Sequence, residues 1–134
     1  MSETSTPIET RKAVVALVGR PNVGKSALFN RMTGQRRASV EDIAGTTRDR
    51  LVGEVEWRGR TFDLIDTGGL AEPTSVEGSG RYMDAIRAQV EAAIEEAQLL
   101  LFVVDAKTGP TSADQEVADL LRRSGKPALL IANK

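Results

Sequence analysis

The sequence predicts an α/β domain built as a three-layer sandwich around a mainly parallel β-sheet. Short, continuously apolar runs alternate with helical segments, which is typical of parallel strands that are covered on both faces. The first run, from about Ala13 to Val18, is followed by a glycine-rich turn and a helix. One pair of strands joined by a tight turn adds an antiparallel hairpin at the edge.

The segment after the first strand predicts a helix and then a long loop. The helix is expected from about Lys25 to Met32, and Gly34 is a suitable C-cap because glycine readily adopts the left-handed conformation found there. Gln35 to Arg50 shows no clear periodicity, so we expect a loop. A loop of this length in a compact domain is commonly functional or mobile.

An antiparallel hairpin is expected next. Polar and apolar residues alternate from Leu51 to Arg58, which indicates a half-exposed strand. A turn at Arg58-Gly59 leads into a second strand, from Thr61 to Asp66. A second polar, glycine-rich loop should then extend from about Leu70 to Gly80.

The rest of the chain predicts two helices and two strands in alternation. The apolar runs Leu99 to Val104 and Ala128 to Ala132 predict the strands. The helix between them is expected to begin with a capping box made by Ser112 and Gln115 and to end at Gly125. The helix before them carries on one face Met83, Ile86, Val90, Ala93, Ile94 and Ala97.

Composition excludes several classes of function. The chain has 134 residues, about one domain, and a net charge of −1, which argues against a broadly basic surface for DNA. It has no cysteine and no histidine, so thiolate or imidazole metal sites are excluded. No apolar run is long enough to span a membrane, and the polar residues 1–12 predict a flexible tail. We therefore expect a cytoplasmic protein with no membrane partner.

The most specific motif is the glycine-rich turn after the first strand. It fits the pattern G-x-x-x-x-G-K-S, whose backbone N–H groups surround a phosphate at the start of a helix. Lys25 supplies a positive charge to the outer phosphates, and the Ser26 hydroxyl can hold Mg²⁺. The residues expected to bind a nucleotide here are Gly19, Arg20, Pro21, Asn22, Val23, Gly24, Lys25, Ser26 and Ala27.

Two further segments fit a nucleotide site, although each alone is compatible with an ordinary turn or loop. Asp66 ends a strand, where a carboxylate can hold Mg²⁺ through water, and Gly69 follows at the D-x-x-G spacing with a backbone N–H open to a terminal phosphate. Thr47 can bring a hydroxyl and a carbonyl to Mg²⁺, which would order the long loop only while that phosphate is present. The expected contacts beside Gly69 are Thr67, Gly68 and Leu70.

The chain ends on Asn133-Lys134, the start of an N-K-x-D pattern. In that pattern the asparagine contacts the guanine ring and the lysine stem packs along it. The aspartate, which would lie two positions past Lys134, accepts hydrogen bonds that adenine cannot supply. For the dipeptide alone, a polar strand end is the plainer interpretation.

Together these motifs make the sequence similar to the translation-factor-related, Era-like P-loop GTPases. It looks most like the first G domain of the Der (EngA) family, bacterial GTPases with two tandem G domains. The resemblance covers Ala13 to Lys134. The segments that carry it are Val18–Ser26, Leu28–Arg31, Gly45–Arg50, Leu64–Gly69, Leu100–Asp105 and Ala113–Arg122.

The resemblance implies a P-loop NTPase fold, GTP hydrolysis and a role in assembling the large ribosomal subunit. It implies that GTP or GDP binds with Mg²⁺ held by Ser26, Thr47 and Asp66. Potassium-activated relatives hold K⁺ at the position of Asn22. A second G domain and a KH-like domain would follow in the intact protein.

The resemblance also assigns roles in catalysis. Lys25, Thr47 and Gly69 would position and stabilise the γ-phosphate during attack by water. Leu70 stands where Ras-like proteins carry a water-positioning glutamine, so we expect very slow intrinsic turnover. Residues 13–134 would then be the N-terminal portion of a G domain, cut within the N-K-x-D motif, with one sheet edge and adjoining apolar faces uncovered.

Two alternatives stay open. An ATP-using P-loop enzyme would share the phosphate-binding motif, because the guanine-specific pattern is incomplete here. A non-catalytic module that binds GDP or a partner protein is the other, because the remaining strand and helices of a G domain are missing from the sequence.

Overall fold

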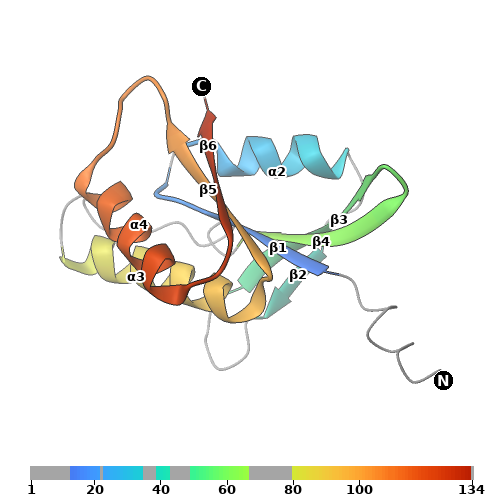
Figure 1. The fold of residues 1–134 in the computed structure, drawn as a ribbon, viewed down its shortest axis with the longest axis horizontal. Coiled ribbons are helices and arrows are strands. Elements are labelled where there is room, and N and C mark those ends of the chain that lie inside the picture. The colour runs from blue at the N-terminus through green and yellow to red at the C-terminus, as the bar shows by residue number, and fades with distance from the viewer. Residues whose placement is uncertain (1–12, 22, 35–38, 43–48, 67–79, 134) are drawn as a thin grey trace.

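One six-stranded β-sheet organises the chain, with helices on both faces (Figure 1). The computed structural model describes residues 13–21, 23–34, 39–42, 49–66 and 80–133. The strands are β1 (Ala13–Val18), β2 (Ser39–Asp42), β3 (Asp49–Trp57), β4 (Arg60–Asp66), β5 (Leu99–Asp105) and β6 (Ala128–Asn133). The helices are α2 (Lys25–Thr33), α3 (Gly80–Glu96) and α4 (Ser112–Ser124). Within these described ranges, no helix has the length and hydropathy needed to cross a membrane.

The strands lie in the order β2-β3-β4-β1-β5-β6. β1 is parallel to β4 and β5, and β5 is parallel to β6, whereas β3 is antiparallel to β2 and β4. Parallel neighbours require crossovers, which α3 supplies between β4 and β5 and α4 between β5 and β6. α2 lies on one face of the sheet, and α3 and α4 pack together on the other (Figure 1). The predicted α/β sandwich with a mainly parallel sheet is confirmed.

The predicted turns and caps lie where glycine allows a left-handed backbone. Gly34 has φ 62° at the C-cap of α2, and Gly125 has φ 73° at the C-cap of α4. The β3–β4 hairpin turns through Arg58 at φ 53° and Gly59 at φ 78°. Two consecutive residues with positive φ match the twist of the flanking strands, so this turn sets the register of the hairpin.

The long loop expected over Gln35 to Arg50 is not entirely loop. Ser39–Asp42 form β2, an edge strand, and β3 begins at Asp49 instead of Leu51, so that Asp42 pairs with Asp49. An edge strand is held mainly by backbone hydrogen bonds to one neighbour, and the sequence Ser-Val-Glu-Asp carries too few apolar residues to reveal it by alternation.

The capping box of α4 lies one residue earlier than predicted. Thr111, not Ser112, is the N-cap, and its Oγ1 accepts a hydrogen bond from the backbone N–H of Asp114 at 3.3 Å. The Asp114 carboxylate in turn accepts from the backbone N–H of Thr111 at 3.0 Å, in place of Gln115. Thr111 and Asp114 have the same spacing as Ser112 and Gln115, and each pair begins with a hydroxyl residue. The spacing alone therefore could not show which pair forms the capping box.

Two apolar clusters fill the space between the layers. The α2 side of the sheet buries Val15, Leu17, Val23, Phe29, Val55, Leu64, Leu101 and Val103. The side covered by α3 and α4 buries Ala16, Val18, Ile65, Tyr82, Ile86, Val90, Ala93, Ala97, Leu100, Ala113, Val117 and Leu121. Arg87 of α3 also pairs with Glu116 of α4 at 2.8 Å, and this hydrogen bond and charge raise the pKa of Arg87 above its usual value.

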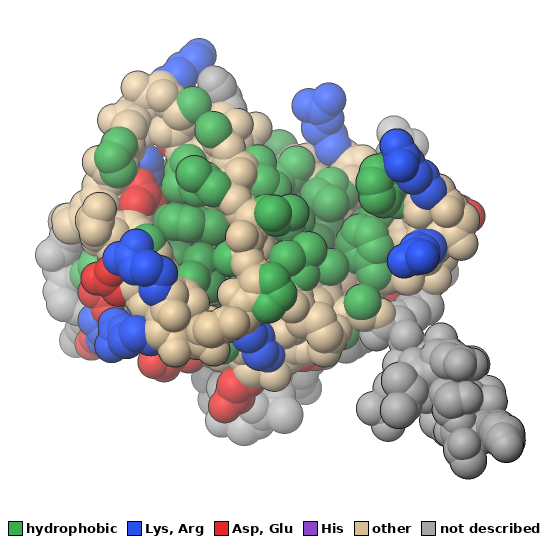
Figure 2. Space-filling model, viewed as in Figure 1, with side chains coloured by type: hydrophobic (Ala, Val, Ile, Leu, Met, Phe, Trp, Pro, Cys, Tyr) green, Lys and Arg blue, Asp and Glu red, His purple; other side chains and the backbone are tan. Residues whose placement is uncertain are grey.

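Apolar surface remains exposed on both sides of β6. Leu129 and Leu130 point to opposite faces of this edge strand and are 56% and 68% exposed. Figure 2 shows apolar side chains gathered around β6 on this face of the molecule. A hollow of about 350 Å³ lies between β6 and α4, and a separate one of about 610 Å³ lies beside α2 and the hairpin, away from β6. α2 alone therefore does not cover its face of the sheet.

α2 packs directly against the backbone of β3 at Gly53. A Cβ atom added there would lie 2.7 Å from Cγ2 of Thr33 and 3.0 Å from Cζ of Phe29. Both neighbours are themselves buried in the contact between α2 and the sheet, so neither can move away freely. Glycine at this position thus fixes the distance between α2 and the sheet.

We expect Gly53→Val to lower the free energy of unfolding by about 1–3 kcal/mol or more, because the new side chain overpacks this contact. Chemical denaturation of the full-length protein measures the change. Thr61→Val, at an exposed strand position, is the matched control and should be nearly neutral. Equal stabilities for the two variants would contradict the close packing of α2 on β3.

Candidate phosphate-binding site

The residues predicted to bind a nucleotide lie at the carboxyl ends of the parallel strands. β4, β1, β5 and β6 are parallel, so their carboxyl ends meet at this edge. Asp66 at the end of β4 pairs with Leu17 of β1, and Asp105 at the end of β5 pairs with Asn133 of β6. The chain leaves β1 toward β4 and later returns to β5 on the other side, and α/β sheets bind ligands at such switch points.

The turn after β1 begins with a close backbone contact. Gly19 has φ 149°, and a Cβ atom there would lie 2.5 Å from the carbonyl oxygen of Val103 in β5. No side chain fits at this distance, so glycine lets the chain pass over β5 and turn toward α2. Gly24 is the N-cap of α2 with φ 99°. Because glycine has no side chain, the cap itself satisfies none of the first N–H groups of the helix.

The buried side chain of Lys25 connects the first residue of the turn to the end of β4. Its Nζ atom donates to the carbonyl oxygen of Gly19 at 3.1 Å and lies 3.9 Å from Oδ1 of Asp66. The side chains of Lys25 and Asp66 are 5% and 0% exposed. A buried ammonium needs oxygen partners, because removing it from water is costly. The positive charge is thus fixed between the ends of β1 and β4, at the start of α2.

Asn133 holds the other end of the turn. Its Nδ2 atom donates to the carbonyl oxygen of Val23 at 3.1 Å, and its own carbonyl accepts from the N–H of Ala106 at 2.8 Å. Val23 is fully buried. The sequence predicted Asn133 as a contact of the guanine ring. The structure adds a contact to the phosphate-binding turn, over a separation of 110 residues that no local pattern reveals.

Arg20 is anchored away from the turn, which the sequence did not predict. Its Nη2 atom donates to Oγ1 of Thr108 at 2.9 Å, and its Nε atom lies 3.4 Å from the carboxylate of Asp114. Its guanidinium therefore bonds the β5–α4 connection, and only its backbone remains for a ligand in the turn. The adjacent Pro21 is also buried.

The other predicted residues divide into two groups. Ser26 and Ala27 are exposed in the first turn of α2, directly after Lys25. The rest lie outside the described residues, and they are Asn22, Thr47, Thr67, Gly68, Gly69, Leu70 and Lys134.

The donors at this edge fit Mg²⁺. The hydroxyl of Ser26 and the carboxylate of Asp66 are oxygen ligands of the kind that Mg²⁺ prefers, and no nitrogen or sulfur ligand competes with them in a chain without histidine or cysteine. A bound Mg²⁺ would neutralise charge on the phosphates beside it.

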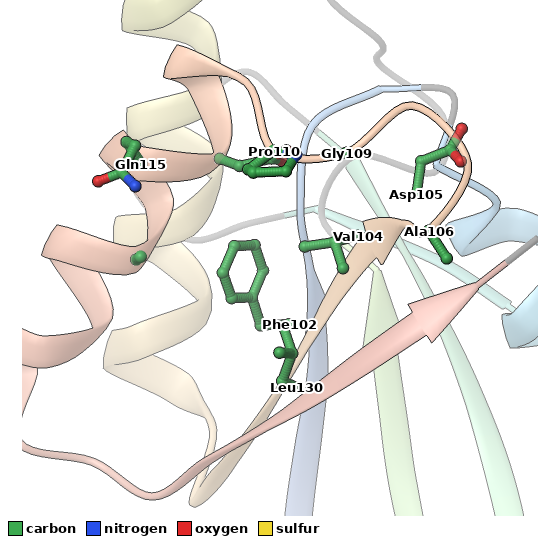
Figure 3. Close-up of a pocket in the computed structure, with 10 residues that line it drawn as sticks. Phe102, Val104, Asp105, Ala106, Gly109, Pro110, Gln115 and Leu130 are labelled. Atoms are coloured by element: carbon green, nitrogen blue, oxygen red, sulfur yellow. The ribbon is translucent and has the colours of Figure 1, made fainter.

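The two hollows described above are distinct from this site. Neither is lined by Lys25. In the one beside α4, Phe102 of β5 and its register partner Leu130 of β6 lie side by side on the face toward the helix, while the carboxylate of Asp105 points away (Figure 3). Their linings are mainly apolar and suit side chains of another segment better than a phosphate.

Known proteins share the sequence and the fold of this chain. A family model described as a 50S ribosome-binding GTPase matches residues 14–134. GTPase Der of Thermomicrobium roseum is 59% identical over 90% of this chain, which corresponds to 26% of that protein. The chain thus spans about a quarter of the length of such curated relatives.

Two solved structures of Era share the fold. A variant of Era from Aquifex aeolicus bound to GDP·AlF4⁻ is 32% identical, with a TM-score of 0.66 over 93% of this chain and 41% of that one. Era in complex with MgGDPNP and a segment of 16S ribosomal RNA is 29% identical, with a TM-score of 0.64 over 92% of this chain and 41% of that one. The family match, which spans nearly all of the sequence, shows that the chain belongs to the 50S ribosome-binding GTPases and is similar to GTPase Der.

Proposed function

We propose that this chain binds GTP and hydrolyses it to GDP and phosphate, with the phosphates in the turn between β1 and α2. The observation that carries the proposal is the buried ammonium of Lys25, held by Gly19 and Asp66 where the parallel strands end. A fixed positive charge beside uncapped helical N–H groups attracts an anion. The membership in a GTPase family makes GTP the natural ligand.

Phosphoryl transfer requires mainly positioning and charge neutralisation from a protein. The backbone of the turn would bind the phosphates, and Lys25 would stabilise the charge that develops on the outer ones. Ser26, Thr47 and Asp66 would hold Mg²⁺, with Asp66 acting through water. The N–H of Gly69 would contact the γ-phosphate.

Turnover is expected to be slow in this chain. Leu70 has no group that can orient or deprotonate the attacking water, so an activator is needed. Asn22 would hold K⁺, and the charge of that ion would then assist hydrolysis. Thr47 and Gly69 would make the loops around them responsive to the γ-phosphate, as in other nucleotide switches.

We place this activity in the assembly of the large ribosomal subunit in the cytoplasm. The description of the family supports a ribosomal partner, and the RNA bound to Era supports ribosomal RNA as part of the docking surface. The resemblance adds a second G domain and a KH-like domain in the intact protein.

We expect Lys25→Ala to weaken binding of GDP and GTP by about a hundredfold, because it removes the only full charge that faces the phosphates in the described part of the site. Titration of the full-length protein with a fluorescent GDP analogue measures the affinity. Arg31→Ala removes a charge from the exposed last turn of the same helix and serves as the control. If Lys25→Ala keeps the affinity of that control, the turn is not the phosphate site.

We expect GTP to displace the fluorescent GDP at least about a hundredfold better than ATP does, because a site built for the N1–H and amino group of guanine leaves polar groups unpaired with adenine. Competition titrations with both nucleotides measure this ratio. Equal displacement would favour the ATP-using alternative.

Hydrolysis of GTP should be about tenfold or more faster in K⁺ than in Na⁺, because one preorganised charge is worth a barrier change of that order or larger. Phosphate release by the full-length protein is measured in matched salts. Asn22→Ala should remove the difference. A wild-type protein with equal rates in both salts would exclude the role of Asn22.

A further inference from the structure

We propose that Arg20 is a positioning residue of the phosphate-binding turn, acting through Thr108 and Asp114 at the start of α4. Its guanidinium ties the second residue of the turn to the β5–α4 connection and so sets the affinity of the turn for a phosphate. The inference rests on the proposed function, because it assigns this role within the same site.

Arg20 bonds two acceptors, and its ion pair with Asp114 is buried. Nη2 of Arg20 donates to Oγ1 of Thr108 at 2.9 Å, and Nε lies 3.4 Å from both carboxylate oxygens of Asp114. The side chains of Arg20 and Asp114 are 9% and 5% exposed. Water screens such a pair little, so the two groups hold each other in one geometry.

Both acceptors are themselves held in place. The carboxylate of Asp114 accepts from the N–H of Thr111 at 3.0 Å, in the capping box that begins α4. The N–H of Thr108 donates to Oδ1 of Asp105 at 3.3 Å, and the same oxygen accepts from the N–H of Lys107 at 2.8 Å. Arg20 is therefore attached to the end of β5 and the first turn of α4, not to a free side chain.

The anchor fixes the first half of the turn, and Asn133 fixes the second. Arg20 lies between Gly19, which passes close over β5, and the buried Pro21. The carbonyl oxygen of Val23 is bonded by Asn133. The turn that we propose to bind the phosphates is therefore held at two points, Arg20 and Val23. Small displacements of binding groups are costly for a ligand that must meet several at once.

Stability alone does not explain this ion pair. Replacing a buried ion pair with apolar side chains of similar volume is often neutral or stabilising, whereas the charged pair enforces one geometry. Arg20 and Asp114 lie 94 residues apart in the sequence, and their ion pair joins the turn after β1 to the first turn of α4. If the ion pair holds the turn in position, this explains why both Arg20 and Asp114 are charged.

The test compares five variants of the full-length protein with the wild type, the fifth being Thr108→Val. Arg20→Gln and Asp114→Asn each remove one charge, and asparagine can still accept the N–H of Thr111. The third variant combines both changes. Val117→Ala, which only opens a cavity under α4, is the control for lost stability. Affinity for GDP, KM and kcat for GTP, and the unfolding temperature without nucleotide are measured for each.

Each single variant should weaken GDP binding about tenfold and raise KM to a similar extent, with kcat within about twofold, because the turn binds ground state and transition state alike. The double variant should bind GDP about as tightly as the weaker-binding of the two single variants, because each single change already breaks the same ion pair. Val117→Ala should bind GDP as the wild type does. Thr108→Val, which removes one neutral acceptor, should weaken binding by only a few fold.

The results separate the possible failures. If the charge variants lose stability but bind GDP like Val117→Ala, or if kcat falls while KM is unchanged, Arg20 does not position the turn and the inference is wrong. If Arg20→Gln does not fold, unchanged GDP affinity in both Asp114→Asn and Thr108→Val would overturn it equally. A folded wild-type protein without affinity for guanine nucleotides would instead overturn the proposed function, and this inference with it.

Discussion

A single buried ammonium constrains the functional edge of this molecule. Lys25 lies at the first position of α2 and reaches Gly19 at the end of β1 and Asp66 at the end of β4. Such a charge is tolerated in the interior only where oxygen atoms surround it. The three elements must therefore meet at one point, and the turn between β1 and α2 must close around it. The packing of α2 at Gly53 holds the helix close to the sheet, and the pairing of β1 with β4 brings Gly19 and Asp66 to the same end of the sheet.

The turn is held by residues that come late in the sequence. Asn133 at the end of β6 bonds its second half, and Thr108 and Asp114 bond Arg20 in its first half. β6 is an edge strand with two exposed leucines, so Asn133 is presented by a strand that only one neighbouring strand holds in place. Any structure that covers the apolar hollow between β6 and α4 would stabilise the strand that presents Asn133. Coverage of that edge and phosphate binding are linked through this one side chain.

Local patterns predicted the elements whose signals are local. The apolar run of β1, the glycine pattern of the turn and the Arg58-Gly59 hairpin each depend on neighbouring residues, and each was found where expected. β2 was missed because an edge strand is held by backbone bonds and needs no apolar alternation. The α4 capping box was placed one residue late because two frames fit the same spacing. The Arg20 anchor and the Asn133 bond join residues about a hundred positions apart, so only the fold brings them together.

The residues that we propose for phosphate binding and for catalysis come from different kinds of segment, and Lys25 belongs to both groups. Gly19, Lys25, Asp66 and Asn133 lie on or at the ends of regular elements, where hydrogen bonds and burial fix them. Thr47 and Gly69, to which we assign contacts with the reacting phosphate, come from the segments between β2 and β3 and between β4 and α3. A rigid cradle can bind GDP and GTP alike, because both share the phosphates it holds. We therefore propose that the segments carrying Thr47 and Gly69 distinguish GTP from GDP, while the turn binds both.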